Sequence, residues 1–144
     1  MIIAPSLYLA LYTIVFLMMA VNGISMVLRG KFLLTIGFGI GRSMEPAIPG
    51  GVTMTIEYYP YNLEEGDVIS FKHDGDYICH RIVDISDRGT YYYTKGDNNH
   101  FDDPRVHKSD IRSKIWQPFG HVLYIPLSPY AVKYSIDKVI SYVR

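Results

Sequence analysis

The sequence predicts a mainly β fold, a small folded β-sheet or barrel, with one apolar helix before it and a short amphipathic helix after it. Positions 7–28 contain no Asp, Glu, Lys or Arg. From position 33 onward, short runs rich in Val, Ile, Thr, Tyr and Phe alternate with Gly, Pro, Asn and Asp, which is the pattern of strands and turns. We therefore expect an N-terminal anchor over 1–30, a β-rich domain over 31–126 and a C-terminal helix over 127–144.

The apolar segment has the length of a transmembrane helix. Its 22 residues would span roughly 33 Å as a helix, close to the thickness of the hydrocarbon core of a bilayer. A cleavable secretory signal would begin with basic residues and contain a shorter apolar run, whereas no basic residue precedes position 7. We expect a retained single-pass anchor. Arg29 and Lys31 follow it, and the positive-inside bias alone would place the rest of the chain in the cytoplasm.

Charge and cysteine content exclude two classes of protein. The formal net charge is zero and both signs are scattered, so no basic stripe indicates nucleic-acid binding. The single cysteine, Cys79, excludes an intrachain disulfide.

Seven strands are expected in the β-rich part. An Asp-Gly pair at 74–75 separates two of them and predicts a hairpin turn. The expected strands cover 33–40, 52–58, 67–72, 77–83, 90–95, 111–117 and a short run near 121–124.

The C-terminal segment has a helix start signal. Ser128 is a capping residue, and Pro129 suits the first helical turn. The apolar residues that follow roughly share one face. Such a helix either packs on the β-rich domain or lies on a membrane surface.

The segment Gly-Arg-Ser-Met-Glu-Pro at 41–46 contains the first candidate for chemistry, Ser43. Three glycines at 37, 39 and 41 precede it and would let another extended backbone approach closely. Pro46 sharpens the turn after the serine. A serine there presents its hydroxyl and its backbone N–H together, as acyl transfer requires. Taken alone, the pattern also fits an ordinary loop serine.

A base for this serine is available in a predicted strand. Serine is a poor nucleophile without a neighbouring base, and histidine, the residue type found at position 80, is the side chain that most often serves as one. Cys79 and His80 are consecutive, so a strand would direct them to opposite faces and exclude a Cys–His dyad. We expect Cys79 to be a packing residue. A single histidine is usually an ordinary surface or core residue and not a catalytic base.

Acidic residues follow in the segment Thr-Lys-Gly-Asp-Asn-Asn at 94–99 and in the next four positions. A tight turn explains the Gly-Asp-Asn sequence by itself. An aspartate close behind could instead orient the imidazole, as in other Ser-His-Asp sites.

Taken in order, these segments resemble type I signal peptidases of the archaeal and endoplasmic-reticulum branch. The run 43–46 matches the nucleophile box, 66–69 a structural box, 80–83 the general-base box and 94–99 the acidic box. The branch assignment depends on His80, because bacterial and mitochondrial members carry lysine there. The resemblance covers about 36–124. It implies a signal-peptidase-type β domain with Ser43 as nucleophile, His80 as general base, Asp103 as its partner, Asp97 as a supporting acid and Asp102 as the fallback partner.

The resemblance also implies the activity. The chain would be a membrane-bound serine endopeptidase that removes N-terminal signal peptides from secretory precursors after small residues, without metal or cofactor. Its partners would be those precursors, the lipid bilayer and the secretion translocon. The catalytic domain would lie on the extracytoplasmic side of the cell or endoplasmic-reticulum membrane, and here we let the motifs overrule the charge bias of Arg29 and Lys31.

The substrate is expected to lie as an added strand between 36–41 and the strand before His80. The residues expected to line its binding site are Ile40, Gly41, Tyr77, Ile78 and Cys79. Two departures from the family pattern stand out. Position 41 is glycine where bacterial members carry a hydroxyl residue that helps to bind the oxyanion, and the closing segment at 120–126 matches only loosely.

Three other interpretations remain open at this stage. A catalytically inactive anchored β domain could act as a scaffold or binding module. A self-cleaving repressor-type relative is disfavoured by the anchor and by histidine in place of lysine. A metal hydrolase is disfavoured because no H-E-x-x-H helix is present; its ligands would come from His80, His100, Asp102, Asp103 and His107.

Overall fold

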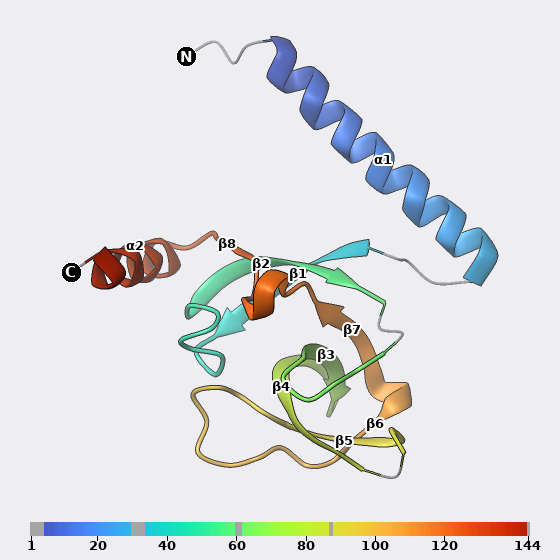
Figure 1. Ribbon diagram of the computed structural model, residues 1–144, viewed down its shortest axis with the longest axis vertical. Helices are drawn as coiled ribbons and strands as arrows, with labels where there is room; N and C mark the ends of the chain where they lie inside the picture. The colour runs from blue at the N-terminus through green and yellow to red at the C-terminus, as the bar shows by residue number, and fades with distance from the viewer. Residues whose placement is uncertain (1–4, 30–33, 60–61, 87, 144) are drawn as a thin grey trace. The chain divides into compact units, whose positions relative to one another are not determined.

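The computed structural model describes residues 5–29, 34–59, 62–86 and 88–143 (Figure 1). The chain divides into two compact units, Met1–Thr35 and Ile36–Arg144. The first contains the N-terminal helix and the second contains nearly all of the sheet. The predicted mainly β architecture with two helices is confirmed.

The N-terminal helix α1 covers Pro5–Arg29, as the apolar pattern predicts. Most of its large apolar side chains are exposed. Near its end, the Asn22 side chain accepts a hydrogen bond from the Leu34 amide at 2.7 Å. Among the described residues, the structure contains no helix with both the length and the apolar content of a membrane span. The transmembrane part of the prediction therefore has no support from the structure.

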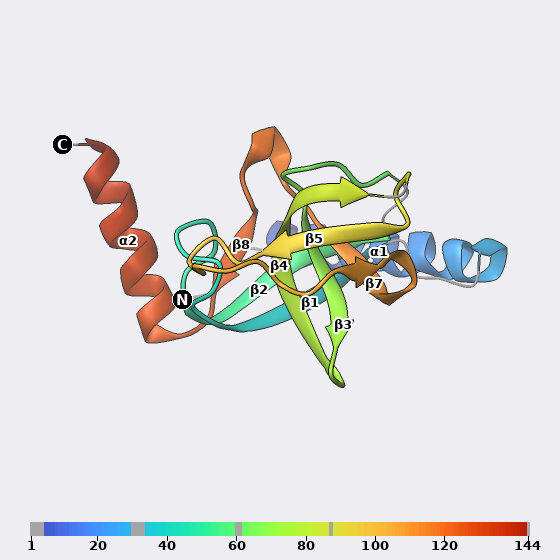
Figure 2. The same cartoon turned by 90° about the horizontal axis from the view of Figure 1, so that it is seen from below.

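The second unit is built on one antiparallel sheet of eight strands, in the order β1-β2-β7-β3-β4-β5-β6 with β8 paired to β2. In Figure 2, β5 runs alongside the second half of β4. The strands are β1 Leu34–Gly41, β2 Gly51–Tyr58, β3 Val68–His73, β4 Asp76–Ser86, β5 Tyr91–Lys95, β6 Val106–His107, β7 Ile111–Ile115 and β8 Tyr124–Pro126.

Six of the seven predicted strands lie within a few residues of their expected bounds. The seventh, expected near 121–124, begins only at Tyr124. Positions 121–123 are irregular. A short 3₁₀ helix, Pro118–Gly120, lies just before them, and its residues Phe119 and Gly120 both have positive φ. Strand β6 was not predicted, because two residues are too few to show an alternating pattern. A second 3₁₀ helix, Lys108–Asp110, follows it.

Two clusters of buried apolar residues hold the sheet together. The larger consists of Ile69, Phe71, Ile82, Tyr92, Val106 and Ile111. The smaller consists of Met44, Ile48, Val68 and Ile115, with Cys79 packed against it. Because Met44 follows Ser43 directly, burial of its side chain fixes one side of the turn that carries the candidate nucleophile.

The C-terminal helix α2, Pro129–Val143, begins where the capping signal predicts. The Ser128 hydroxyl accepts hydrogen bonds from the amides of Ala131 and Val52, at 3.3 and 3.1 Å. Ala131 is fully buried, so the first turn packs on the β domain as one of the two alternatives requires. The second half of the helix exposes Ile136, Val139, Ile140 and Tyr142.

Helix α2 also contacts the turn that follows Ser43. The Tyr130 hydroxyl donates to Glu45 at 3.0 Å, and the Lys138 ammonium donates to the Pro46 carbonyl at 2.8 Å. The buried Glu45 carboxylate also accepts from Arg42 and from the Gly50 amide. Burial raises the pKa of Glu45, but the hydrogen bonds from Arg42, Tyr130 and Gly50 outweigh it and hold the pKa below its ordinary value.

Candidate active site

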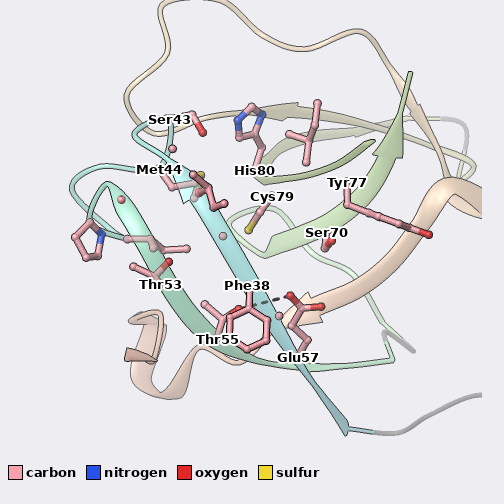
Figure 3. A pocket seen from close by; sticks show the side chains of 18 of the residues that line it. Phe38, Ser43, Met44, Thr53, Thr55, Glu57, Ser70, Tyr77, Cys79 and His80 are labelled. Atoms are coloured by element: carbon pink, nitrogen blue, oxygen red, sulfur yellow. Dashed lines mark hydrogen bonds between the residues drawn. The ribbon is translucent and has the colours of Figure 1, made fainter. Parts of the chain in front are cut away.

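A cavity of about 630 Å³ opens between β1 and the first half of β4, above the inner face of β2 (Figure 3). Ser43 and His80 both line it. In Figure 3 they lie at the same end of the cavity, and the Ser43 hydroxyl is directed toward the imidazole. The two groups that the sequence analysis singled out therefore share one site.

Two strand edges border the cavity. Strand β1 is the terminal strand of the sheet. In β4, residues 76–81 pair with β3, whereas pairing with β5 begins only at Arg81. Residues 76–80 thus have one strand neighbour among the described elements. Unpaired backbone groups on facing edges are the geometry in which an extended peptide can add as a strand.

The imidazole of His80 is fixed by a carboxylate. Its Nδ1 lies 2.6 Å from Asp103 Oδ2. The Thr94 hydroxyl donates to the same oxygen at 2.7 Å, and the Asp103 amide donates to the Thr94 carbonyl at 2.7 Å. His80 is buried, and its ring packs edge-on against Phe71. When Nδ1 donates to the carboxylate, Nε2 is left as the acceptor, which is the tautomer that a general base needs.

The backbone of Ser43 is held from two directions. On one side, the Ile48 amide donates to the Met44 carbonyl and closes the turn. On the other, the Asn98 amide donates to the Ser43 carbonyl at 2.7 Å, and the Asn98 side chain donates to the Arg42 carbonyl at 3.2 Å. The acidic segment 94–99 therefore contacts the nucleophile turn directly. No hydrogen bond joins Ser43 Oγ to His80 within the described residues; in unliganded enzymes such contacts are often long and tighten when substrate binds.

The three candidate aspartates occupy different environments. Asp103 binds His80. Asp97 instead binds the guanidinium of Arg81 with both oxygens, at 2.8 and 2.7 Å. That hydrogen-bonded pair raises the pKa of Arg81. Asp102 is exposed. The geometry therefore assigns the orienting position to Asp103 and a supporting position between strands to Asp97.

The five residues expected to bind substrate, Ile40, Gly41, Tyr77, Ile78 and Cys79, all line the cavity. Cys79 packs against the smaller core cluster, and in Figure 3 its sulfur points away from the imidazole. Burial raises the pKa of the Cys79 thiol to about 12, helped by the nearby carboxyl groups of Glu57 and Asp97. A neutral thiol in this position is a packing group, not a nucleophile.

The glycines before Ser43 have separate structural reasons. Gly41 has a φ of 137° with open space around it, so its backbone conformation requires glycine. Gly37 instead leaves room for a neighbouring side chain, because a Cβ there would occupy the position of the Glu57 carboxyl. The sequence predicts these glycines from the close approach of another backbone. The structure gives two other reasons: the positive φ of Gly41 and the space that the Glu57 carboxyl occupies at Gly37.

The sequence analysis missed several residues that shape the site. Thr94 holds Asp103, Asn98 holds the nucleophile turn, and Asn99 lines the cavity. Thr94 and the two asparagines lie in the segment already noted, where the turn pattern concealed their separate contacts. Glu57 also lines the cavity. Its position in a strand of alternating threonines carries no local signal.

The five residues considered for a metal hydrolase do not form one cluster. Asp103 is bonded to His80 and Thr94, while His100, Asp102 and His107 are exposed. Within the described parts of the chain, no three His, Cys, Asp or Glu side chains are arranged to hold a metal ion.

No family model, no curated protein and no solved structure matches this chain. A functional assignment for this chain therefore has two supports, the short sequence motifs and the geometry of the cavity.

The high pKa of Cys79 predicts slow alkylation. At pH 8 the thiolate fraction of a group with a pKa about three units above its ordinary value falls about a thousandfold. We expect iodoacetamide to modify the folded protein about a thousandfold more slowly than the chain in denaturant, as measured by mass spectrometry. Equal rates in the two states would show that the thiol is open to solvent.

Proposed function

We propose that this chain is a Ser-His-Asp endopeptidase of the type I signal peptidase kind, archaeal and endoplasmic-reticulum branch. The observation that carries the proposal is the partly buried His80–Asp103 pair, at 2.6 Å, whose imidazole lines the same cavity as Ser43. The order of the motifs along the chain supports the same assignment.

In this mechanism Ser43 attacks the scissile carbonyl of an extended peptide. His80 accepts the hydroxyl proton at Nε2 and returns it to the leaving amine, while Asp103 stabilises the imidazolium that forms between the two steps. Water, activated by the same imidazole, then hydrolyses the acyl-enzyme. The Thr94 hydroxyl keeps Asp103 in position throughout, because it donates to the oxygen that faces His80.

The oxyanion of the tetrahedral intermediate needs hydrogen-bond donors. The Ser43 amide supplies one, and Gly41 offers no hydroxyl for a second. Asn99 lines the same cavity, and among the described residues its side-chain amide has no hydrogen bond. We assign it as the second donor.

The substrate would lie between the edge of β1 and residues 76–80 of β4. Ladder hydrogen bonds to those edges would give affinity without sequence preference, and side-chain pockets would give specificity. Selection for small residues before the scissile bond, of the Ala-x-Ala kind, follows from the family resemblance. Ile40, Tyr77 and Ile78 are positioned to limit the size of the side chains admitted.

Membrane attachment is part of this proposal. Helix α1 exposes large apolar side chains over most of its described length, and no charged residue lies between positions 7 and 28. Such a surface would be stabilised by lipid. Secretory precursors and the secretion translocon would meet the enzyme at the extracytoplasmic face of the cell or endoplasmic-reticulum membrane, where Arg29 and Lys31 could pair with anionic headgroups.

The first test is cleavage of a secretory precursor by the purified full-length chain. We expect one cut after a small residue, and a loss of about 10⁴-fold or more in rate for Ser43→Ala and for His80→Ala. The products are identified by mass measurement. A folded wild-type protein that leaves precursors intact, and whose Ser43 does not react with serine-directed reagents, would favour the inactive scaffold instead.

The neighbouring aspartates provide a matched pair of variants. Asp103→Asn removes the carboxylate that holds His80 and should lower the rate by about three to four orders of magnitude. Asp102→Asn changes the same charge one residue away on an exposed side chain, and we expect about twofold change or less. A reversed ranking in the cleavage assay would move the orienting role to Asp102.

Topology can be read from a cysteine placed next to the exposed hairpin turn, at the first residue of β4, Asp76→Cys. A membrane-impermeant maleimide should label it from outside intact cells, with little background from the half-buried Cys79, whose raised pKa keeps the thiol neutral. The readout is a mass shift on a gel. Labelling only from the cytoplasmic side would contradict the assignment, because signal peptides are removed on the other side.

A further inference from the structure

A carboxyl group lies in the cavity at the end away from Ser43. Glu57 projects from β2 onto the inner face of the sheet, and in Figure 3 it lies at the opposite end of the cavity from Ser43 and His80. It is 7% exposed. The mechanism proposed above does not use it.

The hydrogen bonds of the Glu57 carboxyl are both with hydroxyl groups. Ser113 donates to Oε2 at 2.5 Å, and Thr55 donates weakly to Oε1 at 3.5 Å. No Lys, Arg or His side chain lies within ion-pair distance of it among the described residues. A carboxyl group has about four acceptor positions. Two hydroxyl donors fill about half of these positions on the Glu57 carboxyl. Burial of the remaining acceptor positions without a donor costs free energy.

Gly37 directs this carboxyl toward the free edge of β1. Glu57 Oε1 occupies the space that a Cβ of Gly37 would fill, so the carboxyl lies across β1 instead of stopping at β2. Since β1 is the terminal strand, the next strand on that side would be the substrate. A side chain of that strand pointing to the inner face would meet Glu57.

The position along the substrate follows from the strand spacing. We place the substrate strand parallel to β1, so that it advances one residue for each residue of β1 and its scissile bond lies beside Ser43. Gly37 precedes Gly41 by four positions and Ser43 by six. The substrate residue opposite Glu57 is therefore about four to six residues before the scissile bond, beyond the small residues next to the cut.

We propose that Glu57 forms a polar subsite that binds a lysine side chain of the substrate about four to six residues before the scissile bond. This inference rests on the proposed function, because the occupant of the groove is the substrate strand. An ammonium group donates up to three hydrogen bonds and accepts none, so it complements a carboxyl whose other partners are hydroxyls. Arg112, the other charged residue of the cavity wall, stacks on Tyr77 at 4.8 Å and forms no ion pair with Glu57.

The test measures peptide binding and cleavage separately. Fluorescent peptides share one cleavage sequence and carry Lys, Met or Glu in turn at each of the three positions. Met matches the length of Lys without its charge. Binding is measured by anisotropy on the full-length Ser43→Ala protein, and kcat/KM on the wild type. We expect Lys to be favoured over Met about tenfold or more at one position, and Glu to bind worst there.

Two variants locate the effect. Glu57→Gln keeps the length of the side chain and should reduce the preference for Lys over Met to about twofold or less. Glu65→Gln removes an equal charge from an exposed loop outside the cavity and should leave the preference intact. Thermal melts check that each variant is folded.

The outcomes separate the two proposals. Absence of a Lys preference in the Ser43→Ala binding assay would overturn the subsite whether or not the wild type cleaves. The same holds for a preference that persists in Glu57→Gln. Selective binding by Ser43→Ala without cleavage by the wild type would instead support the subsite and contradict the peptidase.

Discussion

The site depends on one partly buried hydrogen bond, between His80 Nδ1 and Asp103 Oδ2. An imidazole in this interior position would be free to rotate about its side-chain bonds unless a neighbouring group selected one orientation. Asp103 does so, and Thr94 in turn holds Asp103 twice, because its hydroxyl donates to the carboxylate and its carbonyl accepts from the Asp103 backbone amide. The interior of the sheet makes these contacts stronger than they would be in water, because few solvent molecules compete. The residues around this pair are accordingly among the most buried polar groups of the domain.

The same sheet leaves a gap between the edge of β1 and the first half of β4. The first half of β4 has no pairing with β5, which pairs with the second half alone. Strand β1 is the terminal strand on the other side of the gap. Exposed strand edges are a liability in most proteins because they invite aggregation. Here the two edges face a shared cavity whose floor carries Thr53, Thr55 and Glu57, polar groups that an apolar strand from another molecule would not cover well. These polar groups would disfavour indiscriminate pairing with apolar strands.

Much of this arrangement could be predicted from the sequence. Alternating apolar residues and Gly-containing turns gave six of the strands, since these signals are local. Capping by Ser128 is local as well. The preference for Asp103 over Asp102 came from the family resemblance alone, because the two lie in a loop where no periodicity indicates direction. The displaced β8 has a similar cause, as the positive φ of Phe119 has no sequence signal. Glu57 escaped attention because its environment is created by Gly37 on another strand, a contact that spacing along one segment does not reveal.

The hydrogen bonds between α2 and the turn after Ser43 have a consequence for biosynthesis. Glu45 and Pro46 receive their donors from Tyr130 and Lys138, more than eighty positions later in the chain. A ribosome therefore releases the nucleophile turn long before the groups that brace it have been made. The turn would therefore gain its hydrogen bonds from Tyr130 and Lys138 only after both residues have been synthesised, so complete ordering around Ser43 would wait for the synthesis of α2.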